Sequence, residues 1–438
     1  LLYGKLFQLA PKCRCSPMAE WICELFSNVS AISLAAVLIL IAVRQAKGIR
    51  LAIWQIMLLG ASAVLLTCQI SPEDALRAIN PDVMIFLAGM FVIGEAMQKS
   101  GYLLVLFNRL FSRARNLDQL MIIIIFAMGF LAALLMNDTL AIIGTPLMIY
   151  LARSLKLSVK LFLLTLAFAV TTGSAMSPIG NPQNLLIAVN ANIDNPFSTF
   201  LQYLLLPTVV NLLLAYLLLR VFYRSQFQAG SGCSGKLVLE RGAISDPGLA
   251  RLSEISFLLL FLLILAKVGA VLLGQGREIH LTYIAVISAL PILLFSERRL
   301  EIARDIDWRT LIFFAAMFVL MESVWRSGLI QQVLAGGKAD LGSIPVILAF
   351  SVLLSQVISN VPFVALCQPL LVDPSAQALM ALAAGSTIAG NLFILGAASN
   401  VIIIQNAENS GETITFLEFA RVGVPLTALN ALVYWAFL

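Results

Sequence analysis

Long runs of apolar residues recur along almost the whole chain, and they limit its fold more than any other feature. A helix needs roughly 20 apolar residues to cross a lipid bilayer, and segments of that kind occupy most of the 438 residues. Only 12% of the residues are charged, which is about half of the share in soluble domains. Because so few charges could not cover the surface of a soluble protein, we predict an all-α polytopic membrane protein embedded in a lipid bilayer.

Ten of the apolar segments are predicted as transmembrane helices. They are residues 28–46, 51–70, 83–98, 160–190, 199–222, 254–274, 279–295, 310–325, 376–406 and 413–437. Two further stretches, 120–151 and 343–372, carry a polar break near the middle. We predict that each is a re-entrant hairpin, because arms such as 140–151 are too short for a second crossing. The alternative is two ordinary spans in each stretch.

The distribution of basic residues predicts the orientation, because Lys and Arg collect in cytoplasmic loops. With these spans, 19 of the 28 Lys and Arg residues fall on one side and seven on the other, while Lys267 and Arg421 lie within spans. The richer side is therefore cytoplasmic, and both termini are expected outside the inner (plasma) membrane. Residues 1–27 form an N-terminal leader whose apolar core is too short for a cleavable signal peptide. Residues 223–253 form a cytoplasmic linker.

Several functional classes are not expected. The net charge of +5 comes from loop residues that set topology, so no nucleic-acid partner is predicted. The six cysteines form no CxxC pair and His280 is the one histidine, so no cofactor and no Cys/His metal centre are expected. An enzyme is not expected, since an aspartyl hydrolase needs two facing acids and only Asp138 is predicted deep in the membrane. No GxxxxGK[ST] loop occurs, so an ATPase subunit could act only as a separate partner, and nothing indicates one.

The chain contains an internal repeat. Residues 79–101 and 306–328 are identical at ten of 23 positions, including a Glu and a Ser-Gly pair. The match continues at an offset of 223, where Asn137 meets Asn360, and at 216, where Asn184 meets Asn400. The first repeat is 28–222 and the second is 254–438. Each holds five spans and one hairpin, and an odd number of crossings inverts the second copy, as in many secondary transporters.

Polar breaks in the two hairpins and in spans 160–190 and 376–406 predict the functional site. Two prolines and two glycines within residues 173–182 cannot remain helical, and the freed backbone groups must line a polar cavity. The expected substrate- and ion-binding residues are Asn137, Asp138, Thr139, Ser174, Ser177, Gly180, Asn181, Asn184, Ser359, Asn360, Gly396, Ser399 and Asn400. A Na⁺ ion is expected at Asn137, Gly180, Asn360 and Gly396, where carbonyl oxygens and helix ends can converge.

Charged residues within the spans divide into two kinds. Asp138 lies at a hairpin tip, where burial favours the neutral form of a carboxyl group, so we predict a proton-carrying role. The alternative is a cap for the hairpin backbone. Glu95 and Glu322 each precede a base by four residues, so they are predicted to form interfacial ion pairs. Glu418 and Arg421, near the start of the last span, are interpreted in the same way.

The segments Asn137–Pro146, Gly173–Ile187, Ser359–Pro362 and Gly396–Asn400 resemble the ion transporter superfamily. That superfamily contains arsenite permeases, Na⁺/H⁺ antiporters of the NhaD type, divalent anion/Na⁺ symporters and plant silicon efflux transporters. The resemblance extends from residue 28 onward, and it is closest to the arsenite and silicon branch. It implies alternating access, and it allows a homodimer, because family members are often dimers.

The symporters carry Ser-Asn-Thr at both hairpin tips, where Na⁺ and the anion bind. Here both asparagines are present, but the first tip reads Met136-Asn137-Asp138 and the second ends in Val361. The resemblance therefore favours proton coupling. We expect a secondary active transporter of a small inorganic anion or a neutral metalloid oxyacid, coupled to H⁺ or Na⁺. The alternatives are a Na⁺/H⁺ antiporter and a Na⁺-coupled dicarboxylate or sulfate symporter.

Overall fold

The protein is built from α-helices joined by short loops, and the part of the chain described by the computed structural model contains no strand. The described residues are 29–47, 52–190, 193, 195–230, 244–272, 280–328, 343–371 and 374–438. The predicted all-α fold is confirmed. The predicted leader 1–27 lies outside the described residues, and so does much of the predicted linker.

The helices follow the predicted spans closely. The first part of the chain contains α2 (Val29–Lys47), α3 (Ile53–Leu66), α4 (Pro72–Ala78), α5 (Pro81–Lys99), α6 (Tyr102–Phe111), α7 (Leu117–Leu135), α8 (Asn137–Ser154), α9 (Val159–Ser174), α10 (Pro182–Asn190), α11 (Pro196–Phe222) and α12 (Arg224–Gly230). The second part contains α13 (Pro247–Leu272), α14 (Leu281–Phe295), α15 (Arg299–Asp305), α16 (Trp308–Arg326), α18 (Ile344–Ile358), α19 (Asn360–Cys367), α20 (Ala376–Leu392), α21 (Ala398–Asn409) and α22 (Phe416–Phe437), with 3₁₀ turns η1 (Gln368–Leu370) and η2 (Ile394–Gly396).

Six of these helices are long and apolar enough to cross a membrane, namely α5, α7, α11, α13, α16 and α22. The two spans predicted as discontinuous are interrupted, between α9 and α10 and between α20 and α21. Four short helices, α4, α6, α12 and α15, lie in predicted loops. Helix α13 begins at Pro247, inside the predicted linker, because the Asp246 carboxylate accepts a hydrogen bond from Leu249 N at 2.9 Å and starts the helix early.

The predicted hairpin 120–151 is a pair of helices, α7 and α8. Helix α7 has 19 residues and could itself cross a membrane, so the argument from short arms is wrong for this stretch. At the start of α7, Asp118 pairs with Arg220 of α11 at 3.0 Å, and beyond α11 Gln226 accepts a hydrogen bond from Ser158 N before α9 at 3.1 Å. Both outer ends of the α7–α8 pair therefore lie near the start of α9. Re-entry into the membrane stays a prediction.

Corresponding helices recur at the offsets found in the sequence. Helices α4 and α15 begin and end 227 residues apart, and so do α5 and α16. Their packing is reciprocal: α3 packs on α16 while α14 packs on α5, and α8 contacts α21 while α10 contacts α19. Helices of each half therefore pack on helices of the other half in equivalent pairs. The inversion of the second half stays a prediction.

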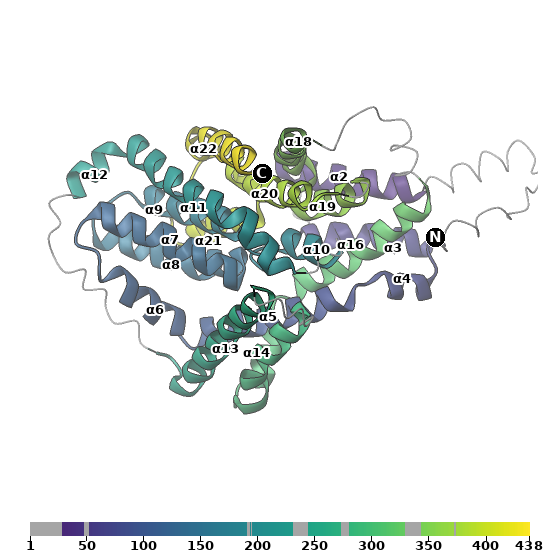
Figure 1. Cartoon of the computed structure of the whole chain (residues 1–438), viewed down its shortest axis with the longest axis horizontal. Coiled ribbons are helices and arrows are strands. Elements are labelled where there is room, and N and C mark those ends of the chain that lie inside the picture. The colour runs from purple at the N-terminus through teal and green to yellow at the C-terminus, as the bar shows by residue number, and fades with distance from the viewer. Residues whose placement is uncertain are drawn as a thin grey trace, which may run out of the picture.

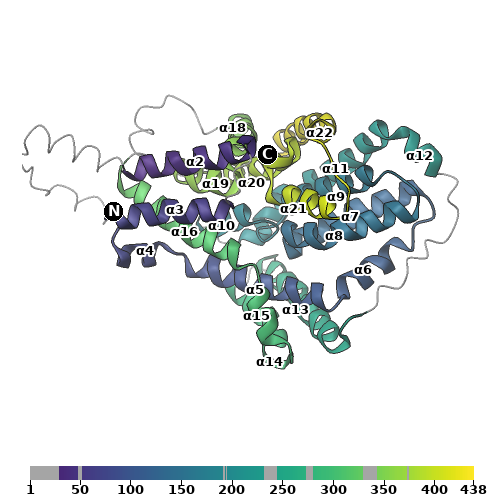
Figure 2. The same ribbon diagram turned by 180° about the vertical axis from the view of Figure 1, so that it is seen from behind.

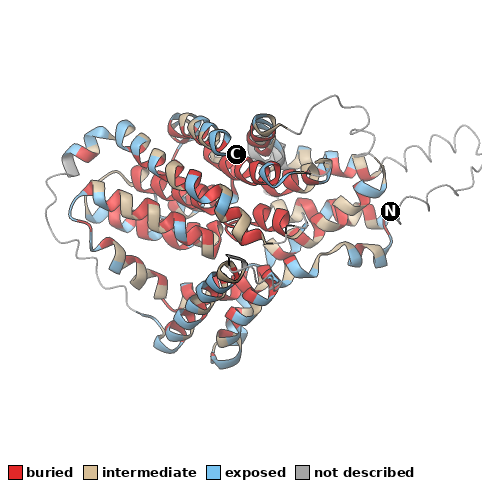
Figure 3. Cartoon of the chain, in the orientation of Figure 1, coloured by how far each residue is buried: buried red, intermediate tan, exposed pale blue. Residues whose placement is uncertain are grey.

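Helices α9 and α20 occupy the centre of the structure. Helix α9 contacts α7, α8 and α11, and α20 contacts α18, α19 and α22; the first four lie side by side in Figures 1 and 2. Buried residues concentrate on these facing surfaces (Figure 3). Every residue of α9 from Leu161 to Ser174, and of α20 from Ala378 to Asn391, is buried. The core therefore surrounds the two helix breaks.

Ion pairs join segments that the predicted topology places on the same membrane side. They are Lys99 with Glu301 and Asp305, Arg326 with Asp74, Arg153 with Glu412, and Lys160 with Glu418. The predicted pairs Glu95–Lys99 and Glu322–Arg326 are confirmed, at 3.5 and 2.7 Å. The pairing of Glu418 with Arg421 is wrong. Glu418 instead reaches Lys160, and the Arg421 guanidinium lies over the Phe222 ring at 5.5 Å.

Candidate functional site

The tips of the two hairpins have the same backbone conformation. Met136, between α7 and α8, has φ 68° and ψ 141°, and Ser359, between α18 and α19, has φ 74° and ψ 152°. A positive φ is uncommon for residues other than glycine. Because the two positions are 223 residues apart, both halves repeat the same sharp turn. Each turn is followed by a helix that begins at an asparagine, Asn137 or Asn360.

The first helix break is held closed by its own asparagines. The Asn184 amide donates to the carbonyl oxygens of Ser174 and Ser177 at 3.2 and 3.0 Å, and Asn181 donates to Ser174 Oγ at 3.0 Å. A side chain at Gly180 would overlap the Ser174 carbonyl, so only glycine fits at that position. Most of the predicted polar groups of this break therefore stabilise the loop itself.

The second break repeats part of this arrangement. The Asn400 amide donates to the carbonyl of Gly390 at 2.6 Å, ten residues earlier, just as Asn184 reaches Ser174. A Cβ added to Gly396 would lie 2.6 Å from the carbonyl oxygen of Ala389. Ser399 is buried, and its hydroxyl has no hydrogen-bond partner among the described residues.

Hydrogen bonds connect the two breaks across the two halves. Asn181 donates to Thr387 Oγ1 at 3.1 Å, and Thr387 donates to Asn184 Oδ1 at 3.3 Å. In the opposite sense, Asn391 of the second half donates to Thr172 Oγ1 at 2.9 Å. The structure therefore brings the two predicted breaks into direct contact.

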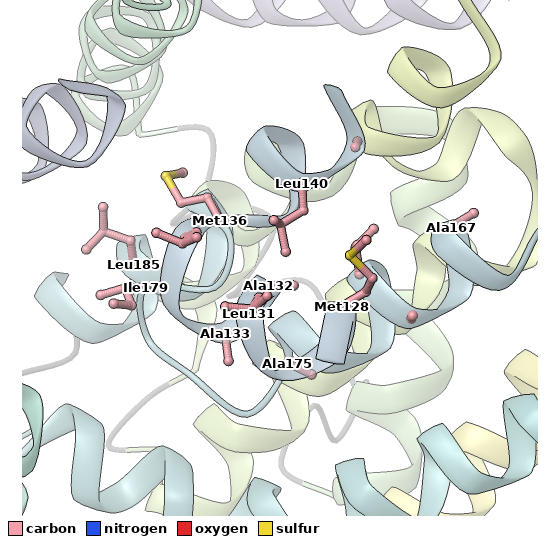
Figure 4. Packing of buried hydrophobic residues seen from close by; sticks show 14 of the residues in the cluster. Met128, Leu131, Ala132, Ala133, Met136, Leu140, Ala167, Ala175, Ile179 and Leu185 are labelled. Atoms are coloured by element: carbon pink, nitrogen blue, oxygen red, sulfur yellow. The ribbon is translucent and has the colours of Figure 1, made fainter. Parts of the chain in front are cut away.

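The hairpins join the same cluster. The backbone N–H of Asn137 donates to the Gly180 carbonyl at 3.0 Å, linking the first tip to the first break. Gln356, one turn before the second tip, donates to the Ala389 carbonyl at 2.7 Å and so contacts the second break. Apolar side chains surround this first contact: Met136, Ile179 and Leu185 belong to the buried hydrophobic core, and Ile179 and Leu185 lie side by side in Figure 4.

Asp138 lies in the first turn of α8. Its side chain makes no hydrogen bond or ion pair with the described residues, so the interpretation as a backbone cap is not supported. Its electrostatic neighbour is Asp307, at the start of α16 in the other half. Thr139 faces α5, where a Cβ added to Gly94 would lie 3.2 Å from its hydroxyl. Asp138 therefore lies at the first tip without an ion-pair partner among the described residues.

Four asparagines of the tips and breaks share an unsatisfied hydrogen-bond acceptor. The side-chain oxygens of Asn137, Asn360, Asn391 and Asn400 are buried and find no hydrogen-bond partner within the described part of the chain. An unpaired buried carbonyl oxygen is costly, and it attracts a hydrogen-bond donor or a hard cation such as Na⁺. Segments 136–139, 171–184, 359–362 and 387–400 contain no Lys or Arg. The site can therefore accept cations or hydroxyl donors without presenting a basic side chain.

A cavity of about 340 Å³ adjoins this cluster. It lies between α10, α16 and α19, so it reaches elements of the first break and of the second hairpin. Its polar side chains are Asn80, Asn190 and Glu322, and the other residues that line it are mostly apolar. Its volume is in the range of small-molecule sites, but no residue of the hairpin tips or helix breaks lines it.

Four residues of the cluster were missing from the predicted site, and one of them is Thr172, which accepts the hydrogen bond from Asn391. Thr387, Asn391 and Gln356 all make hydrogen bonds that hold the breaks together. The internal repeat could have indicated Thr387, because this residue lies 216 residues after Thr171 and so occupies the equivalent position. Gln356 could have been noticed as a lone amide in an otherwise apolar run. Direct convergence of all four predicted asparagines, Asn137, Asn184, Asn360 and Asn400, stays a prediction.

Comparisons with known proteins agree with a transport role. A family model described as citrate transporter (CitMHS) matches residues 36–379. An uncharacterized transporter of Mycobacterium bovis is 28% identical over 403 residues, covering 85% of this chain and 90% of that protein. A silicon efflux transporter of Oryza sativa subsp. japonica is 28% identical over 433 residues, covering 84% and 89%. The chain is similar to transporters and not to enzymes.

Solved structures show the same kind of fold. The crystal structure of the YdaH transporter of Alcanivorax borkumensis matches with a TM-score of 0.57 at 16% identity, covering 83% of this chain and 86% of that one. The MtrF structure of Neisseria gonorrhoeae, described as an antimetabolite efflux pump, matches with 0.54 at 14% identity, covering 94% of each chain. The fold is therefore that of a multi-pass membrane transporter.

Proposed function

The chain belongs to the CitMHS (citrate transporter) family, and from this premise we propose that it is a secondary active transporter of a small, neutral oxyacid. The observation that carries the proposal is the set of buried, unpaired amide oxygens at the hairpin tips and helix breaks. Hydroxyl groups of a protonated metalloid oxyacid can donate to these oxygens. Transport by alternating access would move the solute past the same cluster from either side.

The charge of the site favours a neutral solute over citrate. A tricarboxylate needs guanidinium or ammonium partners, and the tips and breaks carry none. Asp138 adds a carboxyl group at the first tip, which would repel an anion when ionised. We therefore propose a neutral oxyacid, such as silicic or arsenous acid, ahead of a small inorganic anion and ahead of a dicarboxylate or sulfate.

We propose that protons drive transport through Asp138. A carboxyl group at an intramembrane hairpin tip can bind and release a proton as access alternates. Na⁺ is the second candidate for the coupling ion, because the unpaired oxygens of Asn137 and Asn360 suit a hard cation. A Na⁺/H⁺ antiporter without an oxyacid substrate is the alternative function.

The proposal also covers the location, orientation and assembly of the protein. We place it in the plasma membrane with both termini outside, as the basic loop residues predict. The family resemblance supports a homodimer. An ATPase subunit is not needed for this mechanism.

The test is solute flux into proteoliposomes that contain the purified chain. Silicic acid, arsenous acid and citrate are compared with an imposed pH gradient and with an imposed Na⁺ gradient. We expect uphill flux of the oxyacids with the pH gradient alone. Asp138→Asn, which keeps size and hydrogen-bonding capacity, should abolish uphill flux but leave downhill exchange.

Three outcomes would contradict parts of this proposal. Full pH-driven accumulation by Asp138→Asn would exclude Asp138 as the proton carrier. Flux that needs Na⁺ and ignores the pH gradient would identify a symporter, and proton flux coupled to Na⁺ without any oxyacid would identify an antiporter. Glu95→Gln serves as the control, because Glu95 forms an ion pair with Lys99 outside the site.

A further inference from the structure

A second cavity, of about 260 Å³, lies between α6 and the start of α13, away from the hairpin tips and helix breaks. Two arginines, Arg109 of α6 and Arg251 of α13, line it together with Tyr102 and Glu254, and its other walls are apolar. Neither guanidinium makes an ion pair or a hydrogen bond within the described part of the chain. The cavity therefore offers two guanidinium groups to a ligand.

The walls of this cavity are attached to the end of α5. Helix α6 leaves α5 at Gly101, whose φ of 75° allows the sharp turn, and three buried side chains of α6, spaced four residues apart, pack into the core. The segment before α13 is held by a hydrogen bond of 3.1 Å from Ser245 N to the Ser100 carbonyl. The cavity is therefore a feature of the folded core and not a gap between loose segments.

The cavity lies at the level where membrane-spanning helices begin and end. Helix α5 ends at Lys99, α7 begins at Leu117 and α13 begins at Pro247, and all three are long and apolar enough to cross a membrane. Helix α6 has 10 residues, too few to cross, and it contacts α7 and α13 at the edge of the structure (Figure 1). We therefore expect the cavity at the bilayer surface, on the side that the basic residues predict to be cytoplasmic.

An apolar stripe leads from this cavity along α13. Ile255, Leu258, Leu262 and Leu265 follow Arg251 at spacings of four and three residues, which keeps all five on one face of the helix. The four apolar side chains are between 45% and 55% exposed, so this face is available to lipid. A lipid whose headgroup lies at Arg251 can place its acyl chains on the stripe, whereas a soluble anion leaves it unused.

The charge of the cavity suits a phosphodiester. Arg109 and Arg251 together with the Glu254 carboxylate leave a net charge of +1. A phosphodiester carries one negative charge, whereas a phosphate monoester carries about 1.5 to 2 at neutral pH and would be repelled more strongly by Glu254. Guanidinium groups bind phosphate oxygens through paired, charge-assisted hydrogen bonds. The lining therefore favours the headgroup of an anionic phospholipid over a free phosphate.

We propose that the cavity between α6 and α13 binds an anionic phospholipid of the cytoplasmic leaflet. Arg109 and Arg251 hold its phosphate group, and its acyl chains lie along the exposed apolar stripe of α13. Basic pockets between helices on the cytoplasmic side of a membrane are suited to such headgroups. The bound lipid joins the short amphipathic helix α6 to the start of α13, so it stabilises this corner of the transporter.

Native mass spectrometry and thermal melting of the purified full chain in a neutral detergent test this site. The delipidated protein is titrated with dioleoyl phosphatidylglycerol, with dioleoyl phosphatidylcholine, whose choline cancels the charge of the same diester, and with inorganic phosphate. We expect one retained phosphatidylglycerol, with a saturable rise in melting temperature, a weaker effect of phosphatidylcholine and none of inorganic phosphate. An equal rise with inorganic phosphate would overturn the lipid assignment and identify a soluble anion.

Substitutions locate the bound lipid. Arg109→Gln and Arg251→Gln should each weaken phosphatidylglycerol binding about fivefold, and Glu254→Gln should strengthen it because the repelling carboxylate is removed. Arg113→Gln is the matched control, since Arg113 is an exposed basic residue just beyond α6 that does not line the cavity. Its binding should stay close to that of the unmodified chain.

Two results with these variants would overturn the site. If Arg113→Gln weakened binding as much as Arg109→Gln, the overall charge of the surface and not this cavity would attract the lipid. If neither Arg109→Gln nor Arg251→Gln changed the binding, the lipid would lie elsewhere. Both arginines lack ion pairs within the described residues, so the lipid-free variants should melt at the temperature of the unmodified chain.

Discussion

At equivalent positions, the tips of the two hairpins combine a common backbone conformation with different side chains. Met136 and Ser359 adopt the same positive-φ turn, and an asparagine with an unpaired buried oxygen follows each. The next residue is Asp138 at the first tip and Val361 at the second. Because the same backbone geometry carries different side chains, we propose that the two tips share a cation or hydroxyl-donor site, while the first tip alone carries a proton-binding carboxyl group.

The residues that surround the two hairpins also differ. The cavity beside the second hairpin is lined by Asn80 and Glu322. The positions equivalent to them, 227 residues away, are Asp307 and Glu95. Near the first tip, α5 packs against α8, where Gly94 meets Thr139, and near the second tip α16 packs against α19. The surroundings of the two tips therefore differ in side chains, an amide and a carboxylate at the second against two carboxylates at the first.

The largest effect is expected from adding a methyl group at the breaks. Gly180→Ala would drive a Cβ into the backbone carbonyl of Ser174, whereas the Cβ of Gly396→Ala would lie against both the Ala389 carbonyl and the Gln356 side chain, which can move. We expect both variants to lose transport, and Gly180→Ala to lose more stability, about 1–3 kcal/mol. Flux assays and thermal melting of the purified variants measure the two effects.

The control for these variants is Gly269→Ala in α13, whose added Cβ would meet nothing within 4 Å. Helix propensity favours alanine there by up to about 1 kcal/mol. If Gly396→Ala were the more damaging of the two substitutions at the breaks, the ranking of the breaks by their freedom to relax would be wrong.

A smaller effect on flux is expected from substituting the equivalent residues Glu322 and Glu95, which lie near the second and the first hairpin. Glu322 lines the cavity and Glu95, its equivalent, does not. Glu322→Gln removes a charge from the wall of this cavity, so, if the oxyacid passes through the cavity, we expect a change of a few fold in the concentration of oxyacid that gives half-maximal flux. Glu95→Gln should leave that concentration unchanged. Equal responses of the two variants in the same flux assay would mean that both approaches are used alike in the rate-limiting state.

Much of this comparison could be predicted from the sequence. Two prolines and two glycines interrupt the first of these helices, so the break after Ser174 follows directly from the sequence. The break after Leu392 contains no proline and was predicted because Gly396 and Asn400 are equivalent to Gly180 and Asn184. The hairpin tips were also predicted, because Asn137 and Asn360 occupy equivalent places in apolar stretches. The local sequence is sufficient to predict a break or a tip where a polar residue in an apolar stretch can be accommodated only by a turn or a cavity.

Contacts between distant segments could not be predicted in the same way. Asn391 donates a hydrogen bond to Thr172, and Asn181 donates one to Thr387, across more than 200 residues of chain. Which side chains meet depends on how the halves dock, and docking is set by the sum of many weak apolar contacts. The length of α7 was misjudged because the polar residues at the tip were treated as a gap, whereas Asn137 starts the next helix.

The smallest effect concerns the ion pairs that hold the two halves at their ends. Hydrogen bonds from Arg298 and then Lys99 lower the pKa of Glu301 to about 2, and a hydrogen bond from Arg326 lowers the pKa of Asp74. A carboxyl group whose pKa is lower in the folded state stabilises the fold at neutral pH. That contribution is lost as the pH falls below the ordinary range of carboxyl groups, about 4.3 for Glu, toward the folded value.

Glu301→Gln should therefore lower the melting temperature slightly at pH 7 and at pH 5, and the difference from the unmodified chain should shrink toward pH 3. Asp74→Asn should give a still smaller difference, because Asp74 has one base as a hydrogen-bonding partner while Glu301 has two. Both differences should shrink in high salt, since exposed ion pairs are screened and contribute little. A difference for Glu301→Gln that is as large at pH 3 as at pH 5 would mean that side-chain packing, and not charge, joins α15 to α5.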